Sequence, residues 1–218
     1  MCRIAGVINP GATSESLQVW VKEMCQLQKH GGPDDEGIYL SSELPVILGH
    51  RRLSIIDLSQ GGHQPMQSAD GRFCITYNGE LYNYLELKEE LKKVGSRFQS
   101  NSDTEVIIAA FQIWGVNAFK RFNGMFAFAL LDNSSAEVYL VRDLSGIKPL
   151  YFAATKQGLA FASEVKAFHS IPYLQTKSNH WQVYLMAYGH LPEPVTTLHD
   201  VKPLQKGTYL KYNIKTSK

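Results

Sequence analysis

The order of strand-like and helix-like segments constrains the fold of this chain more than any other feature of its sequence. Strand-like segments come first, two adjacent helix-like segments follow, and strand-like hairpins come last. A regular alternation of strand and helix would predict a parallel, doubly wound sheet, and this order does not provide one. We therefore predict an α+β fold of antiparallel sheets and helices.

Apolar spacing and Gly/Pro stop signals give the expected bounds of these segments. The expected helices span residues 14–29, 84–94, 104–114, 163–168 and 179–188. The expected strands span residues 4–9, 37–40, 45–56, 73–77, 125–131, 137–142, 150–153, 159–162 and 207–213.

Charge and hydropathy narrow the classes of function. The net charge is only +2, from 22 basic and 20 acidic residues spread along the chain. We therefore expect neither nucleic-acid binding nor membrane binding, because both normally need a concentrated basic face. The longest apolar run, residues 125–131, is far shorter than the roughly 18 residues of a membrane helix. The N-terminus resembles no secretory signal, so we expect a cytoplasmic protein.

The motifs for common cofactors are missing from the sequence. The three cysteines form no C-x-x-C pair, and the seven histidines stand at no metal-ligand spacing. Neither a P-loop nor a G-x-G-x-x-G segment occurs. We therefore predict that this chain holds no metal and no cofactor, and that its chemistry uses side chains alone.

Cys2 is the first candidate for such chemistry, because removal of the initiator methionine would make it the N-terminal residue. Its thiol would then lie beside its own α-amino group. With ordinary pKa values of about 8.5 and about 7.8, proton transfer between the two groups costs about 1 kcal/mol. Cys2 would then be a nucleophile with a built-in base. A small buried residue at the start of a strand is the alternative interpretation.

The dipeptide Asn78-Gly79 also has two interpretations. Taken alone it favours a hairpin turn, for which Asn-Gly is a strong signal. Alternatively, the side-chain amide of Asn78 and the backbone N–H of Gly79 could form an oxyanion hole. The segment after Gly79 runs directly into a helix and lacks clean strand alternation, which argues against the turn.

Charged residues at the ends of two elements could bind a charged ligand. Ser102 and Glu105 stand three residues apart before a helix, which predicts a capping box. The capping box leaves Asp103 as a free carboxylate that could bind an ammonium group. Arg51 and Arg52 end a strand, either as surface charges or as a bidentate partner for a carboxylate.

Several motifs together resemble the glutamine amidotransferase domain of asparagine synthetases, a class II member of the N-terminal nucleophile hydrolases. The matching segments, in the order of the family, are residues 1–7, 32–37, 52–57, 62–66, 78–80, 102–105, 123–129 and 146–151. One such motif would be weak evidence, but this many in order are highly specific. The resemblance covers essentially the whole chain.

The resemblance implies a four-layer αββα sandwich of two antiparallel sheets. It also implies a role for each matched residue: Cys2 would be the nucleophile, and Asn78 with Gly79 would form the oxyanion hole. Arg52 would hold the α-carboxylate of glutamine, while Asp103 and Glu80 would hold its α-ammonium. Backbone along the segment Leu53, Ser54, Ile55 and Ile56 would line the pocket.

The implied activity is hydrolysis of L-glutamine to glutamate and ammonia through a thioester on Cys2. Residues 1–190 would form the amidotransferase domain, and residues 191–218 an arm towards a synthetase domain that this chain lacks. That domain, acting in cis or in trans, would bind ATP and Mg²⁺ and make asparagine from aspartate. Association into a homodimer is allowed.

Two positions depart from the family pattern. Arg3 stands where the family usually has a small residue, and Gly31 stands where it usually has arginine. These departures support an alternative, in which the chain is a catalytically weak module that binds glutamine or a partner. A thiol hydrolase of another amide is a further alternative, although Arg52 and Asp103 favour a free amino acid as substrate.

Overall fold

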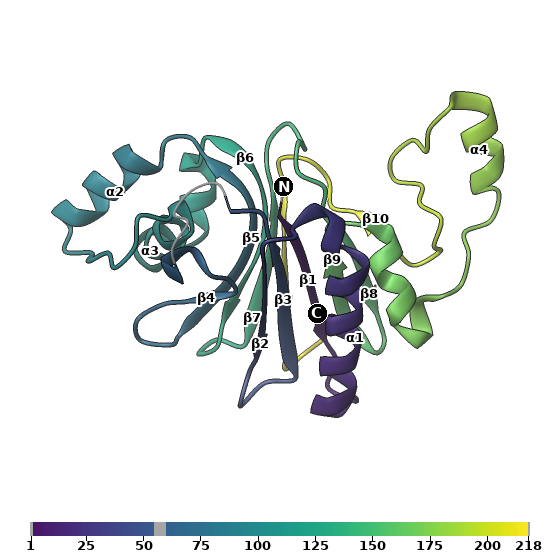
Figure 1. Ribbon diagram of the computed structural model, residues 1–218, viewed down its shortest axis with the longest axis horizontal. Coiled ribbons are helices and arrows are strands. Elements are labelled where there is room, and N and C mark those ends of the chain that lie inside the picture. Colours follow the sequence, from purple (N-terminus) through teal and green to yellow (C-terminus); the bar gives the residue numbers. More distant parts are fainter. Residues whose placement is uncertain (1, 55–59, 218) are drawn as a thin grey trace.

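Two antiparallel sheets form the centre of the molecule in the computed structural model, which describes residues 2–54 and 60–217 (Figure 1). The six-stranded sheet has the order β10-β8-β9-β1-β3-β2, and the five-stranded sheet the order β11-β7-β6-β5-β4. The strands are β1 (Arg3–Ile8), β2 (Asp35–Leu40), β3 (Val46–Arg52), β4 (Met66–Gln67), β5 (Phe73–Leu81), β6 (Gly124–Asp132), β7 (Glu137–Arg142), β8 (Tyr151–Thr155), β9 (Gly158–Ala162), β10 (Lys202–Pro203) and β11 (Tyr209–Asn213).

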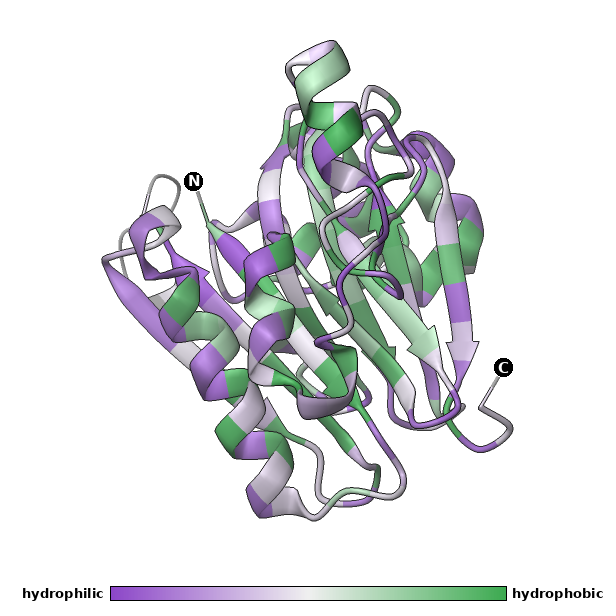
Figure 2. Cartoon of the chain, turned by 90° about the vertical axis from the view of Figure 1, so that its right-hand side faces the viewer, coloured by the Kyte–Doolittle hydropathy of each residue, from purple (hydrophilic) through white to green (hydrophobic). Residues whose placement is uncertain are grey.

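Side-chain alternation along the strands divides the core into layers. In β1, Ile4 and Ile8 lie in the apolar layer between the two sheets, whereas Ala5 and Val7 lie on the outer face of the six-stranded sheet. Figure 2 shows the central strands in mostly hydrophobic colours and the helices with hydrophilic residues along them. Each sheet is therefore buried on both of its faces.

Helices cover the two outer faces. Helix α1 (Ser14–Leu27) begins at Thr13, whose side chain accepts a hydrogen bond from the N–H of Ser16, and packs against β1 and β3. Helices α2 (Tyr84–Lys93) and α3 (Asp103–Trp114) pack on the five-stranded sheet (Figure 1). The predicted αββα sandwich is confirmed.

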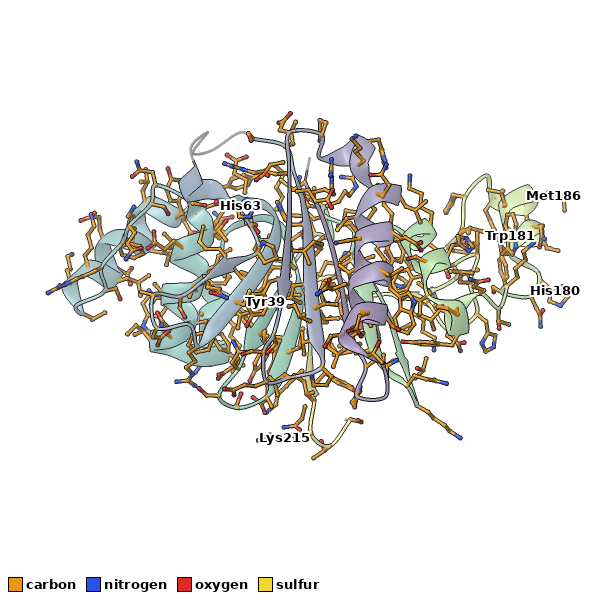
Figure 3. The ribbon with its side chains drawn as sticks, turned by 60° about the horizontal axis from the view of Figure 1, so that its bottom comes forward. Tyr39, His63, His180, Trp181, Met186 and Lys215 are labelled. Carbon is orange, nitrogen blue, oxygen red and sulfur yellow. The ribbon has the colours of Figure 1, made fainter. Side chains whose placement is uncertain are left out.

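A segment near the C-terminus projects from this sandwich. All eight residues of α4 (Trp181–Tyr188) are described and none is buried; Figure 3 shows Trp181 and Met186 at the far edge of the molecule. After α4 the chain returns, and β10 and β11 pair with β8 and β7. The tail therefore adds one edge strand to each sheet. The division of the chain after residue 190 stays a prediction.

Three predicted local structures are wrong. The strand expected over residues 45–56 ends at Arg52, because Leu53 turns out of the sheet; residues 55–59 lie outside the described part of the chain. The strand expected over residues 73–77 continues to Leu81, and β5 pairs Asn78 and Gly79 with β6, which excludes the turn interpretation of this dipeptide. The helix expected over residues 163–168 is the 3-10 helix η4 (Val165–Ser170). None of the described helices is long and apolar enough to cross a membrane.

Candidate active site

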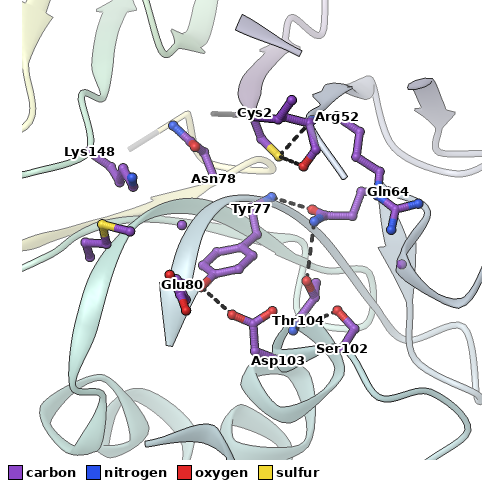
Figure 4. A pocket seen from close by; sticks show the side chains of 14 residues that line it. Cys2, Arg52, Gln64, Tyr77, Asn78, Glu80, Ser102, Asp103, Thr104 and Lys148 are labelled. Carbon is purple, nitrogen blue, oxygen red and sulfur yellow. Dashed lines mark hydrogen bonds between the residues drawn. The ribbon is translucent and has the colours of Figure 1, made fainter. Parts of the chain in front are cut away.

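Strand parity brings three predicted site residues to one end of the layer between the sheets. Cys2 precedes β1, Arg52 ends β3, and Asn78 lies near the end of β5. They share parity with the inter-sheet residues Ile4, Leu48 and Cys74. All three side chains therefore point between the sheets, where they line one pocket (Figure 4).

Two hydrogen bonds fix the distance between the sheets next to this pocket. Nε2 of His50 lies 3.0 Å from the carbonyl oxygen of Tyr77, and Oγ1 of Thr76 donates to the carbonyl of Gly49 at 3.0 Å. Because the partner of Nε2 is a carbonyl, Nε2 carries the proton in the neutral ring. These bonds join β3, which carries Arg52, to β5, which carries Asn78.

Cys2 is held by the backbone that follows β3. Its Sγ lies 3.4 Å from the nitrogen and 3.5 Å from the oxygen of Leu53, as acceptor and donor respectively. Burial raises the pKa of the Cys2 thiol, against the lowering effects of the Leu53 N–H and the charge of Arg52. Burial therefore favours the neutral thiol.

The side-chain amide of Asn78 is buried and makes no hydrogen bond to any described residue. It is 1% exposed, and neither its Nδ2 nor its Oδ1 has a hydrogen-bond partner within the described chain. An unsatisfied buried amide costs about 1–3 kcal/mol, so native proteins normally avoid one. Since Asn78 also lines the pocket with Cys2, the unsatisfied donor is available to a ligand that enters the pocket.

The β5 backbone aims the N–H of Gly79 at the same pocket. The N–H groups of Tyr77 and Leu81 point to the strand edge away from β6, donating to Gln64 Oε1 at 2.7 Å and Asp103 Oδ2 at 2.9 Å. Gly79 lies between them with the same parity, so its N–H points to this edge as well. A side-chain donor and a backbone donor thus face one space beside Cys2.

Asp103 is not the free carboxylate that the sequence predicts. Its Oδ2 accepts hydrogen bonds from Tyr77 Oη at 2.8 Å and from the N–H of Leu81 at 2.9 Å. Burial raises the pKa of Asp103, against the effect of these donors. The carboxylate is therefore fixed in position at the pocket wall, opposite Cys2 in Figure 4.

The predicted capping box at the start of α3 is half correct. The side chain of Ser102 accepts from the N–H of Thr104, as an N-cap does. Glu105, however, accepts from the N–H groups of Gln99 and Ser100. It therefore closes the preceding loop.

The pocket gathers most of the predicted site residues. Its lining includes Cys2, Arg52, Leu53, Asn78, Gly79, Glu80 and Asp103. Ser54 does not line it, and its N–H donates to Asp34 Oδ2 at 2.8 Å. Ile55 and Ile56 lie outside the described residues. The roles of all these residues stay predictions.

Lys148 is the lining residue that the sequence analysis missed most clearly. Its side chain is only 1% exposed, and burial lowers the pKa of its ammonium group, against the raising effects of Asp143 and Cys2. The one available signal was its place in the matching segment 146–151. Gln64 and Tyr77, which join β5 to the start of α3, were missed as well.

The described residues offer no group of three His, Cys, Asp or Glu side chains that could hold a metal ion. The site instead combines a thiol, a side-chain amide, a backbone N–H, an arginine and two carboxylates. Such a set can bind a zwitterionic amino acid and attack a carbonyl carbon.

Known proteins resemble the chain over its whole length. Residues 1–218 match the family model of a glutamine amidotransferase domain. The chain is 37% identical to "Asparagine synthetase [glutamine-hydrolyzing] 1" of Bacillus subtilis, covering 95% of this chain and 33% of that protein. It is 36% identical to "Putative asparagine synthetase [glutamine-hydrolyzing] 2" of Methanocaldococcus jannaschii, covering 89% and 40%.

The chain thus spans only about a third to two fifths of the length of these curated relatives. Among solved structures, the glutamine phosphoribosylpyrophosphate amidotransferase of B. subtilis matches with a TM-score of 0.70. The match has 19% sequence identity and covers 97% of this chain and 47% of that one, which is a likeness of fold.

Proposed function

Because this chain belongs to the class II glutamine amidotransferase family, we propose that it hydrolyses L-glutamine to glutamate and ammonia through a thioester on Cys2. The proposal needs Met1 to be removed, so that Cys2 carries a free α-amine. The observation that carries it is the buried amide of Asn78, which has no hydrogen-bond partner among the described residues and lies in the same pocket as the thiol.

The charged residues of the pocket suit a free amino acid. The guanidinium of Arg52 would bind the α-carboxylate of glutamine, and the carboxylates of Asp103 and Glu80 would bind its α-ammonium. Both charged groups of the substrate need partners once they leave water. The side-chain amide of glutamine would then reach Cys2.

In the first half-reaction, Cys2 Sγ forms a bond with the amide carbon, and its proton moves to the α-amine. The carbonyl electron pair moves to the oxygen, which accepts hydrogen bonds from Asn78 Nδ2 and the N–H of Gly79. When this intermediate collapses, the carbon–nitrogen bond breaks. The α-ammonium returns its proton to the leaving nitrogen, which departs as ammonia.

In the second half-reaction, water attacks the thioester while the amine of Cys2 accepts a proton from it. The same two donors stabilise the second oxyanion. The carbon–sulfur bond then breaks, the proton returns to the sulfur, and glutamate leaves. The chain uses no oxidant, metal or further reactant in this sequence.

Replacing Asn78 tests the observation that carries the proposal. Asn78→Ala should lower kcat by about 10²–10³-fold, because one oxyanion donor is lost, and should change glutamine affinity little. Asn117→Ala is the matched control, since Asn117 is exposed on η3 (Gly115–Arg121). Equal kcat values for Asn78→Ala and wild type would exclude Asn78 from the oxyanion hole.

The state of the N-terminus tests the proposed base. Protein with a verified Cys2 terminus should release ammonia from glutamine, while protein that retains Met1 should be folded and nearly inactive. Cys2→Ala should abolish turnover. Comparable rates from processed protein and from protein that retains Met1 would contradict the mechanism.

The alternative of a weak binding module predicts glutamine affinity without turnover. It assigns the weakness to Arg3 and Gly31, but neither residue lines the pocket. The turnover assay on processed protein separates the two functions.

We further propose that the chain supplies ammonia to a synthetase domain, in cis or in trans, in the cytoplasm. Its longer relatives are named as glutamine-hydrolysing asparagine synthetases, which supports this assignment. ATP and Mg²⁺ would then bind to that domain. A homodimer is compatible with the proposal.

A further inference from the structure

Arg3 lies directly beside the proposed nucleophile but points to the opposite side of the sheet. As an odd-numbered residue of β1 it shares parity with Ala5 and Val7, which face away from the five-stranded sheet. Its Nη1 donates to the carbonyl oxygen of Cys2 at 3.0 Å. The guanidinium therefore holds the backbone of Cys2 from behind the pocket.

The other end of this contact is Glu164. Nε of Arg3 lies 2.5 Å from Glu164 Oε1, and both side chains are about one-fifth exposed. The residue before Glu164 pairs with β1, because Ser163 Oγ accepts from the N–H of Ile4 at 3.0 Å. Arg3 and Glu164 thus join the start of β1 to the end of β9.

Glu164 is held in its ionised form by its surroundings. It also contacts Nε2 of His30 at 3.0 Å and Nζ of Lys166 at 3.2 Å. Burial raises the pKa of Glu164, but the hydrogen bonds and charges of its basic neighbours outweigh this and lower it.

Gly31 leaves the space that the Arg3 side chain occupies. A Cβ at position 31 would lie 2.6 Å from Cζ of Arg3 and 2.7 Å from its Cγ and Nε, closer than real Cβ contacts allow. Gly31 ends the 3-10 helix η1 (Lys29–Gly31), and its backbone is not left-handed. A side chain at position 31 would therefore displace Arg3 from its present position, while the backbone conformation of residue 31 makes no demand for glycine.

The two departures from the family pattern are thus one structural feature, because the Arg3 side chain occupies space that a Cβ at position 31 would take. We propose that Arg3, seated over Gly31 and paired with Glu164, is a positioning residue that orients the Cys2 nucleophile. The inference rests on the proposed glutaminase function. It opposes the view that Arg3 and Gly31 weaken the site.

A double-mutant cycle tests the coupling. In processed protein, Gly31→Ala should displace Arg3 and lower kcat about tenfold with KM nearly unchanged, and Arg3→Gly should do the same. The double variant should be no slower than either single variant, because the added methyl group no longer meets Arg3. Gly11→Ala is the matched control, since a Cβ there makes only an ordinary contact. Additive losses, or no loss, would overturn the proposal.

A second pair of variants keeps the proposal testable where Arg3→Gly disturbs folding. Arg3→Lys keeps the positive charge but loses the guanidinium that contacts both Glu164 and the Cys2 carbonyl. Glu164→Gln keeps the shape of the side chain but loses its charge. Each variant should lower kcat several-fold. Glu90→Gln is the control, because Glu90 pairs with Arg121 at an exposed position and should keep the wild-type rate. Wild-type kcat in both Arg3→Lys and Glu164→Gln would overturn the proposal.

Alkylation of Cys2 by iodoacetamide separates this inference from the proposed function. The other two cysteines are buried, so the partly exposed Cys2 should react first. Gly31→Ala and Arg3→Gly should shift the pH profile of this reaction, even if glutamine is not turned over. Turnover by wild type with unchanged kcat and alkylation profiles in both variants would refute the inference and leave the function intact.

Discussion

His50 makes the stability of the protein sensitive to mild acid. Burial lowers the pKa of its imidazole from 6.5 to about 4, and its Nδ1 has no partner among the described residues. Between these two values the unfolded chain binds a proton that the folded chain does not. The free energy of unfolding is therefore highest above pH 6.5, as far as His50 determines it, and it falls as the pH is lowered towards 4.

The loss should reach about 3 kcal/mol, which urea unfolding at a series of pH values would measure. His50→Gln keeps an N–H that can donate to Tyr77 but has no proton to gain. Its unfolding free energy should therefore depend less on pH in this window. An equally steep dependence in both proteins would show that other groups cause it.

The zwitterion-binding roles of Arg52 and Asp103 are testable by calorimetry. Arg52→Ala and Asp103→Asn should each weaken glutamine binding by about 2–5 kcal/mol, because each leaves one buried charge of the substrate unpaired. Asp103→Asn keeps an oxygen that can accept from Tyr77 and Leu81, so folding should be retained. Unchanged affinity in either variant would refute that residue's role.

Some residues of the candidate site could be predicted from the sequence, and others could not. The motifs that contain Cys2, Arg52 and Asn78 predicted one shared site through the family resemblance, and the structure places these three residues in one pocket. The bond from Tyr77 to Asp103 joins residues 26 positions apart. Such a contact depends on how α3 packs on β5, and no local pattern encodes it.

Strand β5 illustrates the same limit at the scale of an element. Asn-Gly is a strong turn signal, but pairing with β6 keeps the dipeptide extended. Tertiary pairing thus overrides the local preference. The turn interpretation of Asn78 and Gly79 fails because a local pattern gives the turn preference of a dipeptide and not the strand with which it pairs.

The close approach of β5 to β6 gives a prediction for Gly79. A Cβ there would lie 2.4 Å from the oxygen of Met125 and 2.7 Å from Cα of Phe126. Both are backbone atoms, so the strands themselves would have to separate. Gly79→Ala should therefore lower both the melting temperature and kcat.

Gly95→Ala is not a suitable comparison for this change, because Gly95 has a positive φ. Gly11→Ala is suitable, and should leave the free energy of unfolding within about 0.5 kcal/mol of the wild-type value. A Gly79→Ala protein with wild-type melting and kcat would show that the strands tolerate the methyl group.

At the scale of the whole molecule, both sheets contribute residues to the proposed chemistry. The six-stranded sheet supplies Cys2 and Arg52, and the five-stranded sheet supplies Asn78 and Gly79. The antiparallel α+β class was predictable from the order of the segments, because that order argued against a parallel sheet. The four-layer sandwich was predictable only from the family resemblance. The projecting α4 was predictable as a helix but not as an exposed one.

If a separate domain performs the synthetase reaction, ammonia release by this chain should not depend on the substrates of that reaction. Adding ATP, Mg²⁺ and aspartate to processed protein should leave the rate of glutamine hydrolysis unchanged, and no asparagine should form. Aspartate activation needs a phosphate-binding loop and magnesium ligands. Asparagine and AMP made by this 218-residue chain alone would contradict the prediction.

The central place of β1 has a consequence during synthesis. Its neighbours in the sheet are β3 and β9, and β9 ends at Ala162. At about 5–20 residues per second, a ribosome needs roughly 8–30 s to travel from the first codons to that point. During this time the edge of β1 that pairs with β9 has no partner strand. An aminopeptidase therefore has a window of seconds to remove Met1 before the last neighbouring strand arrives.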